Sequence, residues 1–570
     1  MMSSTLTTFP RIELASRCGS SLLTVLAFVA LGCTGDDGQD QSAAGGGTAS
    51  GGSGPGSTTT AEGSGGTKGT ASSTGADDDG GTDETSTVDG STVDEGADEG
   101  TDETGGTSDD GGDGSSTGEQ GHQCDVDVVC TGDTLWSRQH GNTDDAHSSE
   151  WITTVATAPD GTSIIAGTVS GSLDFGDAGS IVGANAGFIA KIDTDGGVVW
   201  ATALQGADGL SVRAADLDAA GNVAVTGFVD GQLDIGGTVV PGGSSFDGFL
   251  LSLDADGALR FGEIYPSDDL NGFYDVAVHP DGNIAVIGYF DAAINLGDSQ
   301  LQATANSEDA IVGLFDSEGG HVWSRRYGDA GAQRGDGVTF DEAGNVVVAV
   351  RNASTIDFGG LPHPTDGWWA IALAKLAAED GQRVWSRQFD DTLSVAAGIP
   401  RVEADAEAIY LGTYGSSPTG HSIDFGVGAE DASFYLAKFA HDGDTQWSRG
   451  FDSHQGVTAI EPDGAGSVLV AGVLQGTDDF GGVELESFMG SHDAFVAKYD
   501  SDSGALYWVR AIGDANQQHN VQQGTGVGTD AAGNVYFGGG FFGAVDFGDG
   551  QLLASNGFGG VDGFFAKLAP

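Results

Sequence analysis

Aspartates recur at one place in a repeated pattern of the chain, in the segment that follows each aromatic residue of the repeat. Carboxylates gathered at the mouth of a ring of repeats would suit calcium or magnesium, which bind several hard oxygen ligands. Alternatively, each aspartate accepts hydrogen bonds within its own turn and binds no metal. Calcium is therefore the one cofactor that we consider. The candidate ligands are Asp145, Asp208, Asp269, Asp329, Asp391, Asp452 and Asp514.

Other catalytic chemistry has no motif in this chain. No Gly-x-Ser-x-Gly segment is present, and the histidines of the repeat region fall at different places in the pattern rather than in pairs at metal-binding spacing. Serine hydrolysis and zinc chemistry therefore lack their usual signatures. We predict no catalytic residue from motifs, although catalysis assembled from several repeats would escape such a search.

The repeat itself is marked by a large aromatic residue. The spacings between successive aromatics are 64, 61, 62, 62, 62 and 61 residues. A period this long and regular indicates a repeat architecture. The positions are Trp136, Trp200, Phe261, Trp323, Trp385, Trp447 and Trp508.

Each repeat contains four short apolar runs separated by turn residues. In one repeat the first run lies around 214–217, the turn at 218–222 leads into a second run at 223–227, a third covers 248–253, and a fourth ends at Phe261. Short runs bounded by Gly, Asp and Asn indicate antiparallel strands joined as hairpins. The aspartates of these turns are expected to be structural.

The two ends of the repeat region complement one another. The chain stops just after the run 563–568, so the last repeat lacks its fourth strand, while residues 134–138 read as a fourth strand with no preceding partners. Joining them removes open sheet edges. The sequence therefore predicts an all-β fold: a seven-bladed β-propeller of four-stranded antiparallel blades, closed by the N-terminal strand. The seven aromatics would then pack between neighbouring blades.

The repeat resembles the SBBP-type propeller repeat of bacterial surface proteins. The likeness lies in the hairpin from Asp530 to Gly538 and in the strand from Asp493 to Lys498, and it covers about residues 131–570. It implies an exported propeller and assigns no catalytic residue. Asp500, Gly504 and Trp508 also resemble the tryptophan-docking pattern of quinoprotein dehydrogenases, although Ser503 replaces the usual threonine and nothing matches a quinone pocket.

The N-terminus reads as an export signal. Arg11 and Arg17 precede the apolar run 22–31, which ends at Gly32 and Cys33. Such a run is too short to span a membrane and is typical of a secretory signal. Its end resembles the lipobox of bacterial lipoproteins, with Ala30 where leucine is usual. The resemblance implies that residues 1–32 are removed and that Cys33 carries the lipid; ordinary secretion with a free Cys33 is the alternative.

A linker and a cysteine pair follow this signal. Residues 33–122 are mostly Gly, Ser, Thr, Asp and Glu, a composition that cannot bury enough surface to fold. Cys124 and Cys130 open the repeat region at 123–570, and in an exported protein two such cysteines are expected to form a disulfide. A metal site with His122 is the weaker alternative, because it lacks a full ligand set.

Charge excludes some partners. The formal net charge is −64, and residues 121–570 hold 63 acids against 17 bases. This balance argues against nucleic acid and against an anionic membrane surface as partners.

We expect a monomeric surface lipoprotein of the outer membrane or cell surface of a Gram-negative bacterium, attached to the membrane only by its lipid. Its propeller would bind a protein or glycan and would more readily be a binding module than an enzyme. The alternatives are an exported polysaccharide lyase or glycosidase and an outer-membrane assembly scaffold.

Overall fold

The computed structural model describes residues 131–141, 148–267, 269–304, 307–365, 369–390, 398–414, 422–451, 456–487, 491–513, 521–555 and 560–570. These residues form an all-β fold, in which the 3-10 turn η1 (Gly176–Ala178) is the one helical element. None of their helices is long and apolar enough to cross a membrane. Cys33, Cys124 and Cys130 lie outside the described residues, so the lipid anchor and the disulfide stay predictions.

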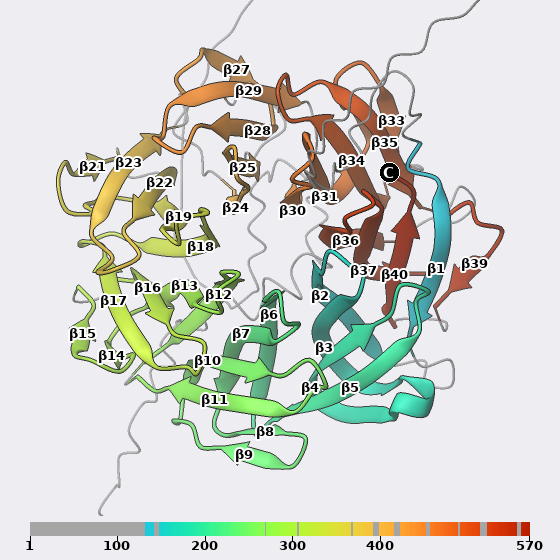
Figure 1. Ribbon diagram of the computed structural model, residues 1–570, viewed down its shortest axis with the longest axis horizontal. Coiled ribbons are helices and arrows are strands. Elements are labelled where there is room, and N and C mark those ends of the chain that lie inside the picture. The colour runs from blue at the N-terminus through green and yellow to red at the C-terminus, as the bar shows by residue number, and fades with distance from the viewer. Residues whose placement is uncertain are drawn as a thin grey trace, which may run out of the picture. The chain divides into compact units, whose positions relative to one another are not determined.

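The strands form antiparallel units of four, arranged around a common centre (Figure 1). The innermost strands are β2 (Ser149–Thr157), β6 (Gly209–Leu217), β12 (Asn271–Val278), β18 (Gln333–Phe340), β24 (Arg401–Ala404), β30 (Val457–Pro462) and β36 (Val521–Thr529). The second strands are β3 (Ser163–Asp174), β7 (Val223–Asp230), β13 (Ile284–Phe290), β19 (Val346–Asn352), β25 (Ile409–Tyr414), β31 (Ser467–Gln475) and β37 (Val535–Phe542).

The two remaining strands of each unit lie farther from the centre. The third strands are β4 (Ser180–Ile192), β10 (Phe246–Leu253), β16 (Asp309–Phe315), β22 (Ala370–Leu376), β28 (Phe434–Phe439), β34 (His492–Asp500) and β40 (Asp562–Leu568). The outermost strands are β5 (Val198–Gly206), β11 (Leu259–Tyr265), β17 (His321–Tyr327), β23 (Arg383–Phe389), β29 (Thr445–Phe451), β35 (Leu506–Ile512) and β1 (Thr134–His140).

Short hairpins are inserted between the second and third strands of most units. They are β8 (Leu233–Ile235) with β9 (Thr238–Val240), β14 (Ala293–Asn295) with β15 (Gln300–Gln302), β20 (Thr355–Ile356) with β21 (His363–Pro364), β26 (Ser422–Asp424) with β27 (Ala429–Asp431), β32 (Thr477–Asp479) with β33 (Glu484–Glu486), and β38 (Ala544–Asp546) with β39 (Leu552–Ala554). The first of these also pairs with β5 and extends that sheet to six strands.

The first described strand pairs with the last. β1 runs antiparallel to β40, with Trp136 opposite Lys567 and His140 opposite Gly563. The unit β1-β40-β37-β36 therefore takes its outermost strand from the N-terminal end of the repeat region, as the sequence predicts. A single parallel contact between His492 and Val521 links it to the neighbouring unit. Two further backbone links join units, the pairing of β8 with β5 and a bridge between Gly513 and Asp546, and none of the described sheets closes on itself.

The core lies between the units. The middle strands β13 and β16 are buried along their whole length, because both faces of their sheet are covered by neighbouring units. This explains why such strands are nearly continuous runs of Val, Ile, Leu and Ala. The outermost strand β17 instead contains buried, half-buried and exposed residues.

Turn aspartates tie the hairpins together. Asp341 accepts hydrogen bonds from the backbone N–H groups of Ala343 and Asn345 and from the Asn345 side chain, at 3.0, 2.8 and 2.9 Å. The buried Lys375 ammonium lies 2.7 Å from the same carboxylate. Asp218 and Asp530 accept the same set of turn hydrogen bonds. The geometry accounts for these acids without a ligand.

Each repeated aromatic lies on a glycine of the next unit. A Cβ added to any of these glycines would lie within 3.1 Å of the ring, and all of them have positive φ. The contacts are Gly196 with Trp136, Gly257 with Trp200, Gly319 with Phe261, Gly381 with Trp323, Gly443 with Trp385, Gly504 with Trp447 and Gly132 with Trp508. The aromatics therefore pack between successive units.

Most of the tryptophans also donate a hydrogen bond to that next unit. Trp200 Nε1 donates to the Ala255 carbonyl at 3.0 Å, and Trp447 Nε1 donates to the Ser501 carbonyl at 2.8 Å. Trp508 Nε1 is buried and has no partner among the described residues. The unit that Trp508 faces has no continuous turn between its third and outermost strands, since these are β40 and β1.

We predict that Gly381→Ala destabilises the fold more than Gly464→Ala. The two glycines have φ of 67° and 64°, but a Cβ at Gly381 would lie 2.7 Å from the Trp323 ring, whereas none of the surroundings of Gly464 lies within 4 Å. Backbone strain should cost each variant about 1 kcal/mol, and overpacking should add about 1 to 3 kcal/mol at Gly381. Urea denaturation of both variants measures the difference. Equal losses of unfolding free energy in the two variants would show that the Trp323 ring accommodates the added methyl group without cost.

Candidate functional site in the central cavity

A polar cavity of about 650 Å³ lies where the innermost strands meet. Its lining residues come from β2, β6, β12, β18, β24, β30 and β36, so every unit contributes. The volume is within the range of small-molecule sites, roughly 300 to 1,000 Å³. The charged or hydroxyl side chains considered below are Thr153, Thr154, Arg213, Asp216, Tyr274, Asp275, Thr339, Arg401, Glu403, Thr458, Glu461 and Thr525.

Threonines in this lining connect neighbouring units. An innermost strand has one partner strand, so its other edge presents unpaired backbone groups to the cavity. Thr153 Oγ1 donates to the Val212 carbonyl of the next unit at 3.2 Å, and Thr458 Oγ1 donates to the Gly524 carbonyl at 2.6 Å. Both threonines occupy β-bulges, which interrupt the strand register at these residues.

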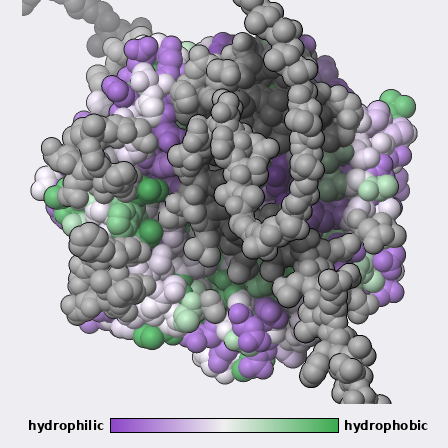
Figure 2. Space-filling model, turned by 180° about the vertical axis from the view of Figure 1, so that it is seen from behind, coloured by the Kyte–Doolittle hydropathy of each residue, from purple (hydrophilic) through white to green (hydrophobic). Residues whose placement is uncertain are grey.

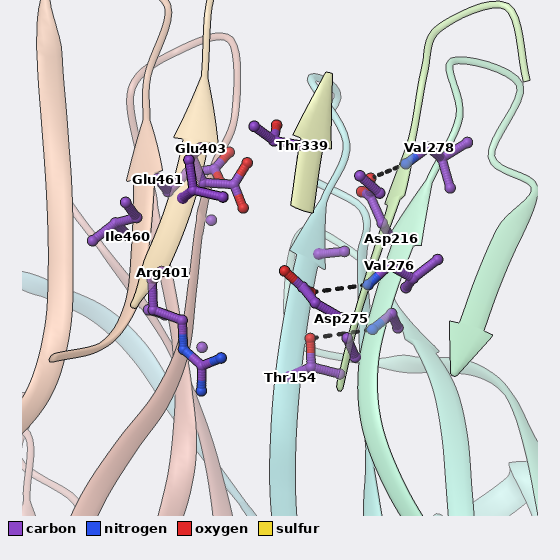
Figure 3. Close-up of a pocket in the computed structure, with 18 of the residues that line it drawn as sticks. Thr154, Asp216, Asp275, Val276, Val278, Thr339, Arg401, Glu403, Ile460 and Glu461 are labelled. Carbon is purple, nitrogen blue, oxygen red and sulfur yellow. Dashed lines mark hydrogen bonds between the residues drawn. The ribbon is translucent and has the colours of Figure 1, made fainter. Parts of the chain in front are cut away.

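Acids and another threonine satisfy the N–H groups of the same edges. Asp216 Oδ2 accepts from the Val278 N–H at 2.6 Å (Figure 3). Asp275 Oδ2 accepts from the Val338 N–H at 2.9 Å. Thr154 Oγ1 accepts from the Ala215 N–H at 3.4 Å. In each case the side chain and the N–H belong to successive units, so these cavity residues also join neighbouring units.

Two arginines line the cavity with different surroundings. Arg401 Nε donates to the Thr458 carbonyl at 2.8 Å, and its Nη1 donates to the Asp336 carbonyl at 3.4 Å. The Arg213 guanidinium lies over the rings of Phe228 and Tyr274, 5.0 and 5.1 Å from their centres. Its Nε is enclosed and has no hydrogen-bond partner among the described residues. Arg213 is therefore a charged donor without a protein acceptor at Nε.

Glu403 and Glu461 lie side by side on neighbouring strands (Figure 3). Thr339, on β18, also lines the cavity (Figure 3). No hydrogen bond joins the Glu461 carboxyl to another described residue, and its oxygens lie at the cavity. Glu461 is thus the cavity acid without a structural partner.

Burial raises the pKa of all four acids. The pKa of Asp216 rises to about 6 and that of Asp275 to about 7, in each case mainly through burial and partly through other carboxylates. The pKa of Glu461 rises to about 8, through burial and then the charges of Asp216 and Asp463. Burial and the neighbouring Glu461 charge raise the pKa of Glu403 well above its usual value. Near neutral pH Asp275 and Glu461 are therefore partly protonated, so these two carboxyls can both donate and accept hydrogen bonds.

The loop aspartates that the sequence suggests as calcium ligands do not coincide with the acids of the central cavity. Asp208 and Asp269 are exposed, and Asp329 accepts hydrogen bonds from Gly331, Gln333 and Ser354 in its own surroundings. None of the three lines the cavity. Among the described residues, no group of three or more His, Cys, Asp or Glu is placed to hold a metal ion. Asp145, Asp391, Asp452 and Asp514 lie outside the described residues, so the calcium ring stays a prediction.

The cavity acids were not recognised from the sequence, although a signal exists. Asp216, Asp275, Glu403 and Glu461 each stand within the first strand of a repeat, where a charged residue interrupts an otherwise apolar run. A charge at such a position indicates either a sheet edge or a cavity. That signal would have favoured these residues over the loop aspartates.

Comparisons with known proteins give a limited result. No protein-family model matches the chain, and no curated protein matches it. Among solved structures the chain is similar to the Dos1 propeller, at 10% identity and a TM-score of 0.36, over 76% of this chain and 94% of that one. It is also similar to Sqt1 from Chaetomium thermophilum, at 12% identity and a TM-score of 0.35, over 75% and 99%.

A third similar structure is a europium-containing methanol dehydrogenase, at 10% identity and a TM-score of 0.33, over 77% of this chain and 93% of that one. TM-scores this low carry no argument about function. The all-β assignment rests on the strand pairing.

We predict that the folded state loses stability as the pH rises from about 5 to about 8.5. In the unfolded chain the four acids ionise near pH 4, whereas their pKa values in the folded protein are raised, to about 6 for Asp216, 7 for Asp275 and 8 for Glu461. Their stabilising contribution is complete below the unfolded pKa and is lost as the pH rises through the folded values. Urea denaturation at a series of pH values measures this loss.

The variant Glu461→Gln separates this effect from general charge repulsion. It should flatten the fall in stability with pH, while Glu318→Gln, at an exposed turn residue, should leave the slope unchanged. Parallel slopes for wild type and Glu461→Gln would contradict the prediction.

Proposed function

We propose that this protein is an exported lipoprotein whose seven-bladed β-propeller binds a protein or glycan partner through its central cavity. The observation that carries the proposal is the cavity, to which every unit contributes and in which the Glu461 carboxyl and Arg213 Nε have no described hydrogen-bond partner. Polar groups left unpaired in a cavity are costly unless water or a ligand satisfies them. A ligand that pairs with them would gain specificity from these groups.

Three contacts support closure of the units as a seven-bladed ring. β1 and β40 pair along their length. Thr525 Oγ1, on β36, donates to the Ile152 carbonyl of β2 at 2.6 Å, so the last innermost strand bonds to the first. Gly132, just before β1, lies under Trp508. Closure of this kind agrees with the SBBP-type repeat proposed from the hairpin and strand motifs.

The scattered distribution of exposed hydrophobic residues supports recognition of a partner by polar contacts in the cavity. Figure 2 shows hydrophobic residues in small separate groups among hydrophilic ones on the visible part of the rear face. The exposed large apolar residues include Val182, Leu361 and Leu552, which belong to different units. Scattered apolar residues of this kind are ordinary surface features rather than a docking patch. The cavity is therefore the better candidate for a binding site than the rim.

The anchor and linker complete the proposal. A lipid on Cys33 would hold the protein at the outer membrane or cell surface, and residues 33–122 would separate the propeller from that membrane. A random coil of about 90 residues spans roughly 50 Å, because its mean reach grows with the square root of its length. The propeller could then meet large partners away from the membrane.

We expect Cys33→Ser to release the protein from the membrane fraction, since acyl chains on this residue would supply the anchoring. Cell fractionation followed by detection of the protein measures this change. The matched control is Cys124→Ser, which should leave membrane attachment unaffected. An unchanged membrane fraction for Cys33→Ser would contradict the lipid anchor.

If the partner binds in the cavity, substitutions of its unpaired charged residues should weaken partner binding. Full-length protein carrying both Arg213→Gln and Glu461→Gln should lose binding to glycans on an array or to envelope proteins in a pull-down. Removing two charged contacts should weaken binding at least about 10-fold. Arg387→Gln, which removes an arginine of the exposed ion pair with Asp444, serves as the control and should bind like wild type. Equal binding by all three proteins would place the partner site elsewhere.

A polysaccharide-cleaving enzyme is the second candidate, favoured by the adjacent Glu403 and Glu461. A carboxyl with a raised pKa can act as a general acid, and a second carboxyl close by can act as base or nucleophile. Turnover of a polysaccharide by wild type but not by Glu461→Gln would favour this function over simple binding.

A further inference from the structure

Two strands of the cavity carry a guanidinium and a carboxyl in the same order along the chain. On β24, Arg401 and Glu403 are alternate residues, and residues two apart on one face of a strand are separated by about 7 Å. On β6, Arg213 precedes Asp216. The two strands belong to units on different sides of the ring (Figure 1). The cavity therefore has a guanidinium level, formed by Arg213 and Arg401, and a carboxyl level beside it.

Arg213 lacks an ion-pair partner among the described residues, whereas the charge of Arg401 already acts on the Asp275 carboxyl. The nearby arginines Arg334 and Arg351 are each paired through two nitrogens with Glu308 and Asp336, at 2.6 to 2.8 Å. Arg213 has no such partner among the described residues. Burial lowers the pKa of Arg213, and the positive charge of Arg401 lowers it further. A carboxylate between the two guanidiniums would relieve both effects, since guanidinium groups bind carboxylates with two parallel hydrogen bonds.

The carboxyl level suits hydroxyl groups better than a metal ion. The described residues provide no three acids or histidines placed for metal coordination. Asp216 and Asp275 each have an oxygen occupied by a backbone N–H of the next unit, whereas the Glu461 carboxyl has no hydrogen-bond partner among the described residues. Carboxyl groups that can donate and accept match neighbouring sugar hydroxyls, which also do both.

A neutral sugar or an organic cation fits only part of this arrangement. A neutral sugar would satisfy the carboxyls and leave Arg213 without an anion. An organic cation would meet the carboxyls but would be repelled by Arg213 and Arg401. A ligand with a carboxylate at one end and hydroxyls at the other matches both levels, and one pyranose ring spans a distance of this order.

We propose that the cavity binds a uronic acid unit of an acidic saccharide, with its carboxylate at Arg213 and Arg401 and its hydroxyls at Glu403 and Glu461. This inference rests on the proposed binding function and names its ligand class. The cavity volume of about 650 Å³ leaves room for such a unit.

Isothermal titration of the full-length protein, kept in detergent, with digalacturonate tests the proposal. The neutral disaccharide galactobiose and the diamine putrescine are titrated in parallel. Digalacturonate should bind about 10- to 100-fold more tightly than galactobiose, because one or two charge-assisted hydrogen bonds separate them. Putrescine should show no binding.

Arg213→Gln should reduce digalacturonate affinity to that of galactobiose. It is the primary variant, because Arg401 also bonds to backbone carbonyls and its removal affects folding. Arg387→Gln is the control and should retain full affinity. The melting temperature of each variant without ligand shows that it is folded, and the stabilisation of each variant by added digalacturonate gives a second measure of binding.

The outcomes separate this inference from the proposed function. If galactobiose binds as tightly as digalacturonate, or if putrescine alone binds, the uronic acid is excluded while a binding role for the cavity stands. If no saccharide binds but envelope proteins are captured through the cavity, the inference fails and the proposed function survives with a protein partner.

Discussion

The free edge of each innermost strand is the constraint on which this fold depends. Each such strand pairs with one neighbour and turns its other edge toward the centre, where unpaired backbone groups would be costly. Side chains of the adjacent units satisfy many of them: Thr153, Thr458 and Thr525 donate to carbonyls, while Asp216 and Asp275 accept from N–H groups. The central cavity is therefore polar because the architecture requires it to be.

This requirement also explains the unusual acid chemistry of the cavity. Acids placed at the sheet edges are brought within electrostatic reach of one another, and the surrounding units partly bury them. The pKa values of Asp216, Asp275, Glu403 and Glu461 rise together as a result. Asp216 and Asp275 have structural partners in this arrangement, whereas Glu461 has none described. Polar groups with a structural partner and polar groups without one thus share the same strands.

The sequence predicts the scaffold better than the site. The aromatic period, the turn aspartates and the split last repeat are local signals, and they correctly predict the strands and the pairing of β1 with β40. The cavity depends instead on which side chains face one another across units, at sequence separations of about 60 residues or more. β-bulges such as that at Thr153 shift the strand phase, so alternation alone does not tell which residues face the centre. Loop aspartates were therefore preferred over strand acids.

The repeats differ most where the cavity is lined. The residue at the bulge of β2 is Thr153, at that of β6 it is Arg213 and at that of β12 it is Tyr274, while the packing aromatics stay nearly uniform. The packing aromatics lie on the outermost strands, whereas the bulge residues lie on the innermost ones. Duplication and divergence of such a repeat can therefore vary the cavity residues one unit at a time while the aromatic contacts are retained, within the limit that some of these residues, such as Thr153, also bond to the next unit.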